Sequence, residues 1–242
     1  MVMVLVILLG LCIGSFLNVA ILRIPKKESI HLPASHCPSC MHPLKWYHNI
    51  PLVSWLMLRG KCAFCQSAIS VQYPLIELLS ALLFAVAYLR LGNLSQALLL
   101  GWVFALLLAL SLIDLRYKAV PDILSLPALF LAFCTHQPLA SLQNGLLFMG
   151  GFTLLRFCVS ALTKREAMGE ADIIIAGIIG AILGIKLGFI AIYCAALLAL
   201  VGFIVVKKRK YELPFIPFLA LGLFITWFFD QHILHVMEYI YE

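Results

Sequence analysis

Long apolar runs separated by short polar segments dominate this chain. A membrane-spanning helix needs about 20 consecutive apolar residues, and all but one of the runs come close to that length. The exception is the run at 123–136. The pattern predicts an all-α, polytopic membrane protein with about eight transmembrane helices, at residues 1–22, 72–90, 95–114, 123–136, 142–162, 172–188, 189–206 and 214–232.

Composition excludes an ordinary soluble protein. Of the 242 residues, 64% are hydrophobic and only 12% are charged, and the mean hydropathy is +1.06. The first run lacks a basic segment before it and a small-residue cleavage site, so we expect it to be retained as a span and not removed as a signal peptide.

Basic residues gather in alternate loops between the runs. The loops on the opposite side hold little more than Arg90 and Lys186. The positive-inside rule therefore places the basic loops in the cytoplasm and both termini outside. The basic residues are Arg23, Lys26, Lys27, Lys45, Arg59 and Lys61 after the first run, Arg116 and Lys118 after the third, Lys164 and Arg165 after the fifth, and Lys207, Lys208, Arg209 and Lys210 after the seventh.

The basic cluster at 207–210 could bind nucleic acid. A basic run beside a span is, however, more simply explained by contact with anionic lipid headgroups. We therefore expect the lipid bilayer, and no nucleic acid, as a partner.

Four of the eight cysteines lie in the one long polar loop, at 23–71, as Cys37-Pro-Ser-Cys40 and Cys62-Ala-Phe-Cys65. Two such pairs, separated by 21 residues, are typical of a tetrahedral structural zinc site. Disulfides would need an oxidising compartment, whereas the charge pattern places this loop in the cytoplasm. We expect zinc to stabilise the fold of the loop without taking part in a reaction.

Other residues of these types carry weaker hypotheses. His36, His42 and His48 could replace a metal ligand or bind substrate, but loop histidines are more often solvated. The remaining cysteines lie within apolar runs, where cysteine behaves as a small apolar side chain. They are Cys12, Cys134, Cys158 and Cys194.

Two aspartates stand at the ends of apolar runs, where a charge is costly. Asp114 closes the third run and Asp172 opens the sixth, which places both at the same membrane face. Two carboxyl groups that meet in a poorly solvated pocket share a proton and can activate water against an amide. Capping of a helix start is the alternative for Asp172 and for Asp122, but it fails for Asp114, which ends its helix.

Glycines accompany the second aspartate. Gly169 precedes Asp172 and permits a tight turn where the sixth run begins. Gly180, Gly184 and Gly188 follow at intervals of four residues and are expected to share a face on which neighbouring helices pack closely.

The motifs together resemble the bacterial type IV prepilin peptidase family, and the likeness runs almost from end to end. They are Gly14-Ser-Phe-Leu-Asn-Val19, the cysteine pairs, Pro51-Leu-Val-Ser-Trp55, Leu58-Arg-Gly60, Tyr73-Pro-Leu-Ile-Glu-Leu78, Ile113-Asp114, Val120-Pro-Asp122, Gly169-Glu-Ala-Asp172 and Pro214-Phe-Ile-Pro217.

The resemblance implies a membrane-embedded aspartic endopeptidase in the bacterial cytoplasmic (inner) membrane. It would cleave the leader of type IV prepilins or type II secretion pseudopilins at the cytoplasmic face, with Asp114 and Asp172 as the catalytic pair. The N-terminal part, 1–91, would carry the zinc loop, and 92–242 the peptidase.

The resemblance also implies methylation of the new N-terminal residue, with S-adenosylmethionine as the methyl donor. No nucleotide-binding fingerprint is present in the sequence. The polar residues to test for this activity are Asn18, Arg23 and Glu77.

Two positions depart from the family pattern. Ala171 stands where the family usually has the second glycine of Gly-x-Gly-Asp, and Ile216 stands where it usually has glycine before the final proline. Ala171 would be strained by about 1 kcal/mol or more if the backbone there required a positive φ.

Two other classes of function stay open on the sequence. A proton-coupled transporter would explain intramembrane carboxylates, but it predicts acidic residues near the bilayer midplane and inverted repeats. A non-catalytic assembly protein would explain the zinc loop. For a peptidase, Glu28, Glu166 or Glu170 could attract the basic leader of the substrate.

Overall fold

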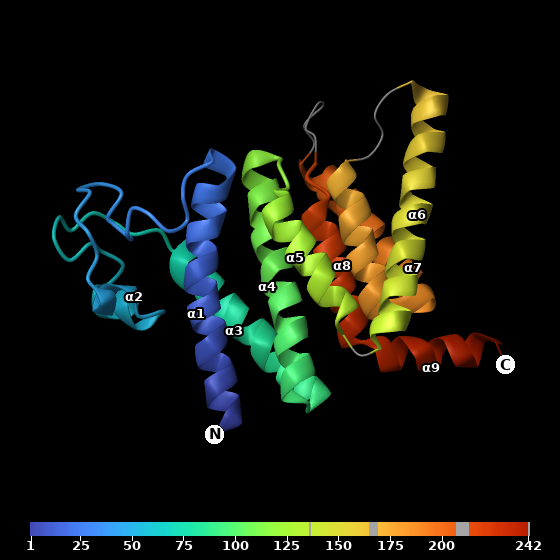
Figure 1. Cartoon of the computed structure of the whole chain (residues 1–242), viewed down its shortest axis with the longest axis horizontal. Helices are drawn as coiled ribbons and strands as arrows, with labels where there is room; N and C mark the ends of the chain where they lie inside the picture. Colours follow the sequence, from blue (N-terminus) through green and yellow to red (C-terminus); the bar gives the residue numbers. More distant parts are fainter. Residues whose placement is uncertain (136, 165–168, 207–212, 242) are drawn as a thin grey trace. The chain divides into compact units, whose positions relative to one another are not determined.

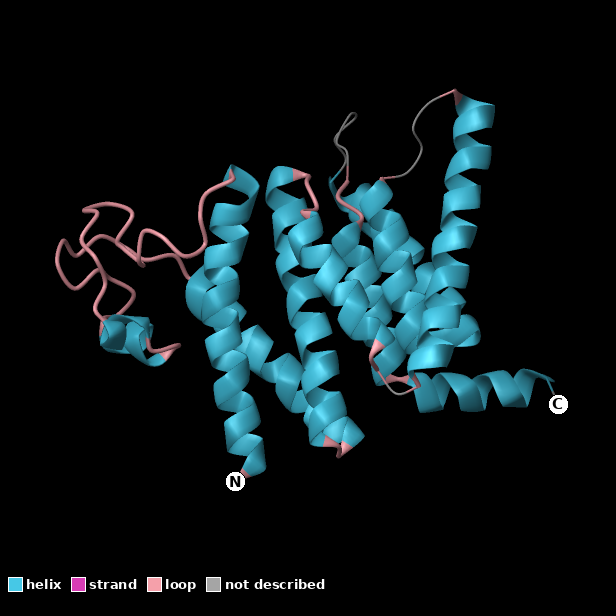
Figure 2. Cartoon of the chain, in the orientation of Figure 1, coloured by secondary structure: helices cyan, strands magenta, loops and turns pink. Residues whose placement is uncertain are grey.

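The computed structural model describes residues 1–135, 137–164, 169–206 and 213–241. Within these ranges the protein is helical, and extended pairing is limited to two isolated bridges in the loop (Figure 2). The predicted all-α class is therefore confirmed. Arg165, Glu166 and the basic cluster at 207–210 lie outside the described residues.

Among the described residues, five helices are long and apolar enough to cross a membrane, which fits the multi-pass protein predicted from the sequence. These residues do not confirm the expected count of eight. A sixth span is present if α8 (Ile216–Phe228) and α9 (Asp230–Tyr241), which meet at 72°, are taken together. The five helices are α1 (Val2–Arg23), α3 (Gln72–Leu91), α4 (Leu94–Tyr117), α6 (Pro138–Thr163) and α7 (Glu170–Val206).

Two features explain the difference in count. The fourth run forms α5 (Asp122–Phe133), which has only 12 residues. The sixth and seventh runs together form α7. This helix is interrupted at Gly184, which has φ 69° and ψ −169°. That conformation is essentially restricted to glycine, so the chain breaks at Gly184 and not at the expected boundary near residue 188.

The predicted glycine stripe is correspondingly divided. A Cβ on Gly180 would lie 2.7 Å from the Phe148 ring, and a Cβ on Gly188 would lie 2.6 Å from the same ring. These two glycines therefore make room for Phe148 of α6, as a packing role requires. Gly184 between them interrupts the helix, so the three do not form one continuous helical face.

The chain forms two compact units, Met1–Ala109 and Leu110–Glu242. In the first unit, α1 and α3 pack side by side (Figure 1). A Cβ on Gly10 would lie 2.6 Å from the Cα of Ala81, and one on Gly14 would lie 2.6 Å from the Cα of Glu77. The two helices therefore approach backbone to backbone.

The loop that joins α1 to α3 is mostly irregular (Figure 2). It contains two short 3-10 helices, η1 (Ile24–Lys26) and η2 (Trp46–Asn49), and the short helix α2 (Val53–Met57).

In the second unit, α7 packs against α5, α6 and α8. Its buried side is rich in isoleucine, with Ile175, Ile178 and Ile179 fully enclosed. This packing holds α7 and α8 side by side.

Candidate active site and metal centre

Asp114 lies near the C-terminal end of α4 and is almost fully buried, with 7% of its surface exposed. Its Oδ2 accepts a hydrogen bond from the backbone N–H of Ile216, at 3.2 Å. Ile216 is the first residue of α8, whose second residue is Pro217. The N-terminus of α8 thus supplies the donor that Asp114 needs, although the two residues are 102 positions apart.

Asp172 is the third residue of α7. Its Oδ2 accepts a hydrogen bond from the backbone N–H of Gly169, at 3.2 Å. This hydrogen bond, from the backbone N–H of the residue before the helix to a carboxylate in its first turn, is one half of a capping box. The capping interpretation and the dyad interpretation of Asp172 are therefore compatible, and Gly169 acts as the donor.

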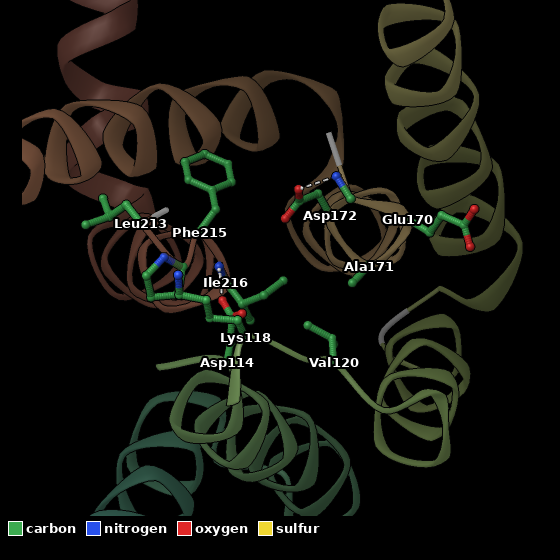
Figure 3. A pocket seen from close by; sticks show the side chains of 11 residues that line it. Asp114, Lys118, Val120, Glu170, Ala171, Asp172, Leu213, Phe215 and Ile216 are labelled. Atoms are coloured by element: carbon green, nitrogen blue, oxygen red, sulfur yellow. Dashed lines mark hydrogen bonds between the residues drawn. The ribbon is translucent and has the colours of Figure 1, made fainter. Parts of the chain in front are cut away.

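Both carboxyl groups line one pocket of about 320 Å³ (Figure 3). Each carboxyl group is hydrogen-bonded to a backbone amide, and among the described residues neither is hydrogen-bonded to the other. The structure thus brings the two predicted residues together in an open arrangement. The pocket is lined by Asp114, Lys118, Val120, Gly169, Glu170, Ala171, Asp172, Leu213, Pro214, Phe215 and Ile216.

The pocket also gathers positive partial charge. The starts of α7 and α8 both border it, and a helix N-terminus carries roughly half a positive charge. Lys118, in the segment after α4, also lines the pocket and carries a full positive charge. These positive groups offset part of the negative charge of the acidic residues that line the same pocket.

The two departures from the family pattern do not strain the site. Ala171 lies in the first turn of α7 and is not among the residues with positive φ, so the strain considered from the sequence does not arise. Ile216 contributes its backbone N–H to Asp114, which any residue except proline can do.

The remaining acidic residues differ in their relation to the pocket. Asp122 begins α5 after Pro121, makes no side-chain cap and does not line the pocket. Glu170 does line it, and forms an ion pair with Arg156 at 3.3 Å. Glu28 is exposed in the loop, and Glu166 is outside the described residues.

The four loop cysteines form a cluster whose Sγ atoms all lie within 4.8 Å of one another. In a tetrahedral site with Zn–S distances of about 2.3 Å, the sulfur atoms are separated by about 3.8 Å. Cys37 Sγ and Cys65 Sγ are 3.8 Å apart. The thiols therefore fit zinc, which would be held by Cys37, Cys40, Cys62 and Cys65.

Each cysteine pair sits in the same backbone turn, repeated 25 positions along the chain. Cys37 N–H donates to the carbonyl of His42, and Cys62 N–H donates to that of Ser67. The residue after each pair has a left-handed conformation, with φ 58° at Met41 and 59° at Gln66. Isolated bridges close both turns, His36 with Pro43 and Lys61 with Ala68. This repeat presents the two pairs to one centre as equivalent halves.

The turn favours the thiolate form, which binds metal, at Cys37 and Cys65 but not at Cys40, whose pKa is raised to about 11 despite the backbone N–H of His42. Hydrogen bonds from the backbone N–H groups of Cys40 and then Ser39 lower the pKa of Cys37 to about 6. The side chain of Ser67 is the main cause that lowers the pKa of Cys65.

The loop histidines do not join the thiol cluster in the described part of the chain. His36 Nδ1 pairs with the carbonyl of Ala34 at 3.0 Å, and the His42 ring packs on Phe64, with ring centroids 3.7 Å apart. His48 lies edge-on to Tyr47. The geometry therefore favours a site of four thiolates.

The polar residues proposed for methyl transfer occupy different places in the first unit. Asn18 is 1% exposed, donates from Nδ2 to the Tyr73 carbonyl at 3.1 Å, and leaves its buried Oδ1 without a hydrogen bond. Glu77 Oε2 accepts from the backbone N–H of Leu52, at 2.7 Å. Arg23 donates to the carbonyl of Ser29 and lies nearer the surface.

Two segments of the sequence match described families. Residues 8–91 match the bacterial peptidase A24 N-terminal domain, and residues 101–204 match the type IV leader peptidase family. A type 4 prepilin-like proteins leader peptide-processing enzyme from Escherichia coli is 36% identical over 239 residues, which cover 88% of this chain and 88% of the relative. The chain belongs to the type IV leader peptidase family.

Further members of the leader peptidase family align over similar lengths. A prepilin leader peptidase/N-methyltransferase from Pseudomonas aeruginosa is 36% identical, with 89% of this chain and 86% of the relative covered. One from Myxococcus xanthus is 40% identical over 72% of this chain, which corresponds to 54% of that relative. No solved structure matches the chain.

The sequence had not indicated what the Pro214–Pro217 motif of this family does. In the structure this segment starts α8 and delivers the N–H of Ile216 to Asp114. The helix-starting proline was a visible signal, but its partner lies in a distant part of the chain and could not be read from the sequence.

Proposed function

We propose that the protein is a membrane-embedded aspartic endopeptidase that removes the leader from type IV prepilins or type II secretion pseudopilins. One observation carries the proposal: Asp114 and Asp172, from α4 and α7, line a single pocket in a chain of the type IV leader peptidase family. The names of the relatives supply the class of substrate.

The proposed reaction uses both carboxyl groups. The ionised one takes a proton from a water molecule, whose oxygen attacks the scissile carbonyl carbon, while the protonated one donates its proton to the carbonyl oxygen. Collapse of the tetrahedral diol breaks the C–N bond, and the leaving nitrogen takes up a proton. The N–H groups of Ile216 and Gly169 hold the carboxyl groups in position, and substrate binding draws the open pair together.

The site lies at helix ends, as the substrate would require. Asp114 is close to the last residue of α4, and Asp172 is in the first turn of α7. A prepilin keeps its basic leader in the cytoplasm and its apolar helix in the bilayer, so its scissile bond reaches the membrane boundary. We therefore place the protein in the bacterial cytoplasmic (inner) membrane, with the pocket at the cytoplasmic face. Glu170 at the pocket and Glu28 in the loop could attract the leader.

The direct test compares Asp114→Asn and Asp172→Asn with the wild type on a purified prepilin in detergent. Proton transfer by a positioned side chain accelerates a reaction by about 10²- to 10⁴-fold. The cleavage rate of each variant should therefore fall by at least about 10²-fold. Asp122→Asn is the matched control, because Asp122 does not line the pocket, and it should cleave normally. Cleavage that persists in either pocket variant would refute the assigned dyad.

We further propose that the first unit methylates the new N-terminus, as the names of the relatives suggest. The α1–α3 crossing offers a buried carboxylate at Glu77 and an unpaired amide oxygen at Asn18, which suit a cationic ligand, and Arg23 suits its carboxylate. These residues would hold S-adenosylmethionine, which supplies the methyl group. Glu77→Gln should weaken binding of the donor, measured by calorimetry, while cleavage by the second unit continues.

The two alternative classes receive less support from the site. A transporter would place its carboxylates near the middle of the bilayer, whereas Asp114 and Asp172 stand at helix ends. An assembly protein without activity gives no reason for two carboxyl groups to share a pocket.

A further inference from the structure

The short helix α2 carries an apolar face that nothing in the described residues covers. Its side chains Leu56 and Met57 are 66% and 78% exposed, and Val53 is exposed beside them. Trp46, in the neighbouring helix η2, is 79% exposed. We call Val53, Leu56 and Met57 the α2 face. Such a concentration of exposed apolar side chains marks an interaction surface.

The opposite side of α2 is fastened to the loop. The Ser54 hydroxyl donates to the carbonyl of Tyr47 at 2.7 Å, and Trp55 Nε1 donates to that of Ile69 at 3.3 Å. Gly60 sits against the Trp55 ring. The helix is therefore two-sided and held in one orientation, so the outward direction of the α2 face is set by the fold.

A hydrogen bond fixes how deep α2 lies. Leu52, which begins the helix, donates to Glu77, and Glu77 stands five residues inside α3. At 1.5 Å per residue this is about 7.5 Å along the axis, comparable to the roughly 6 Å of headgroup region on each side of the hydrocarbon core. In Figure 1, α2 lies beside α1 and not beyond the end where α1 enters the loop.

The charge of the loop indicates what covers the face. Between Arg23 and Val71 the chain has six basic residues but a single acidic one, Glu28. A zinc ion bound by four thiolates would contribute a net charge of about −2, so the net charge of the loop stays positive. Lys45 and Arg59, on either side of the two short helices, are both exposed. Apolar and aromatic side chains flanked by basic ones are typical of contact with an anionic membrane surface.

We propose that the α2 face inserts into the headgroup region of the cytoplasmic leaflet and anchors the zinc loop on anionic phospholipid. The spans α1 and α3 already hold both ends of the loop at the membrane, and the bond between Leu52 and Glu77 keeps α2 from moving outward into water. Lys45, Arg59 and Lys61 attract the phosphate groups, while Val53, Leu56 and Met57 contact the upper acyl chains.

The test uses the purified full-length protein in lipid nanodiscs, with a photoactivatable diazirine amino acid at Met57 and, in a separate variant, at Leu56. The control variant carries it at Ser39, which is exposed but belongs to a cysteine turn and not to α2. After irradiation, intact-mass spectrometry detects the attached molecule. Zinc content, measured for every variant, shows that the loop is folded.

Lipid adducts at positions 56 and 57 but not at 39 are the expected result. Their yield should fall when phosphatidylglycerol is replaced by phosphatidylcholine, or when Lys45, Arg59 and Lys61 are together changed to Gln. The proposal is overturned if position 57 gives no more lipid adduct than position 39, if it crosslinks to a second copy, or if it gives adducts only with an added prepilin. None of these readouts depends on cleavage or methylation.

Discussion

The two units of this protein build their sites by opposite means. The first unit gathers four thiols with a local device, a turn that is repeated 25 positions apart and closed by its own backbone hydrogen bonds. The second gathers two carboxyl groups from helices that are far apart in the chain, and each takes its donor from a helix start. Short motifs therefore specify the thiol cluster, whereas packing of whole helices specifies the acidic pocket.

The largest effect should come from removing one thiolate. Structural zinc contributes on the order of 10 kcal/mol to small domains, so Cys62→Ser should abolish stoichiometric zinc and expose the loop to trypsin at Lys45 and Arg59. Metal analysis and limited proteolysis measure both. Cys158→Ser is the control, because this cysteine is exposed in α6, outside the cluster, and it should keep zinc and protection. Full zinc content in Cys62→Ser would rule out the four-thiolate site.

An intermediate effect, on stability, is expected from a substitution at Gly184, where the backbone of α7 is not helical. Gly184 has φ 69°, and a Cβ there would meet only Asn144 Nδ2, at 3.6 Å. Gly184→Ala should therefore destabilise by about 1–3 kcal/mol through conformation alone, seen as a lower melting temperature in detergent. Gly150→Ala, in open space within α6, should leave stability equal or slightly raised. Equal melting of the two variants would mean that the break at Gly184 is not required.

The smallest effect concerns the residue before Asp172. Because Ala171 is helical without a positive φ, Ala171→Gly gains no relief of strain and costs at most about 1 kcal/mol. Cleavage of a prepilin should stay at the wild-type rate, measured as initial velocity at a fixed amount of folded enzyme. A marked rise in the rate would show that the backbone of the first turn must differ from the one described.

The local cysteine turns could be predicted from the sequence more fully than the pocket formed by distant helices. The cysteine cluster could be anticipated because its spacing encodes the turn. The approach of Asp114 to Asp172 could be anticipated because both stand at the ends of apolar runs that the sequence predicts to lie at one membrane face. The partner of Asp114 could not, because the N–H of Ile216 is a backbone group and leaves no mark in the sequence. The count of eight spans is not confirmed, because the run at 123–136 forms only the short α5, and the sixth and seventh runs form α7 with its break at Gly184.

The way α1 meets α3 has a consequence for the affinity of the metal centre. Gly10 and Gly14 of α1 lie against the backbone of α3. The two helices therefore hold the ends of the loop 27–71 together whether or not metal is bound. The entropy of closing a chain segment grows with its length, and the membrane helices have already absorbed that cost here. The same loop, excised as a peptide, should bind zinc more weakly than the intact chain.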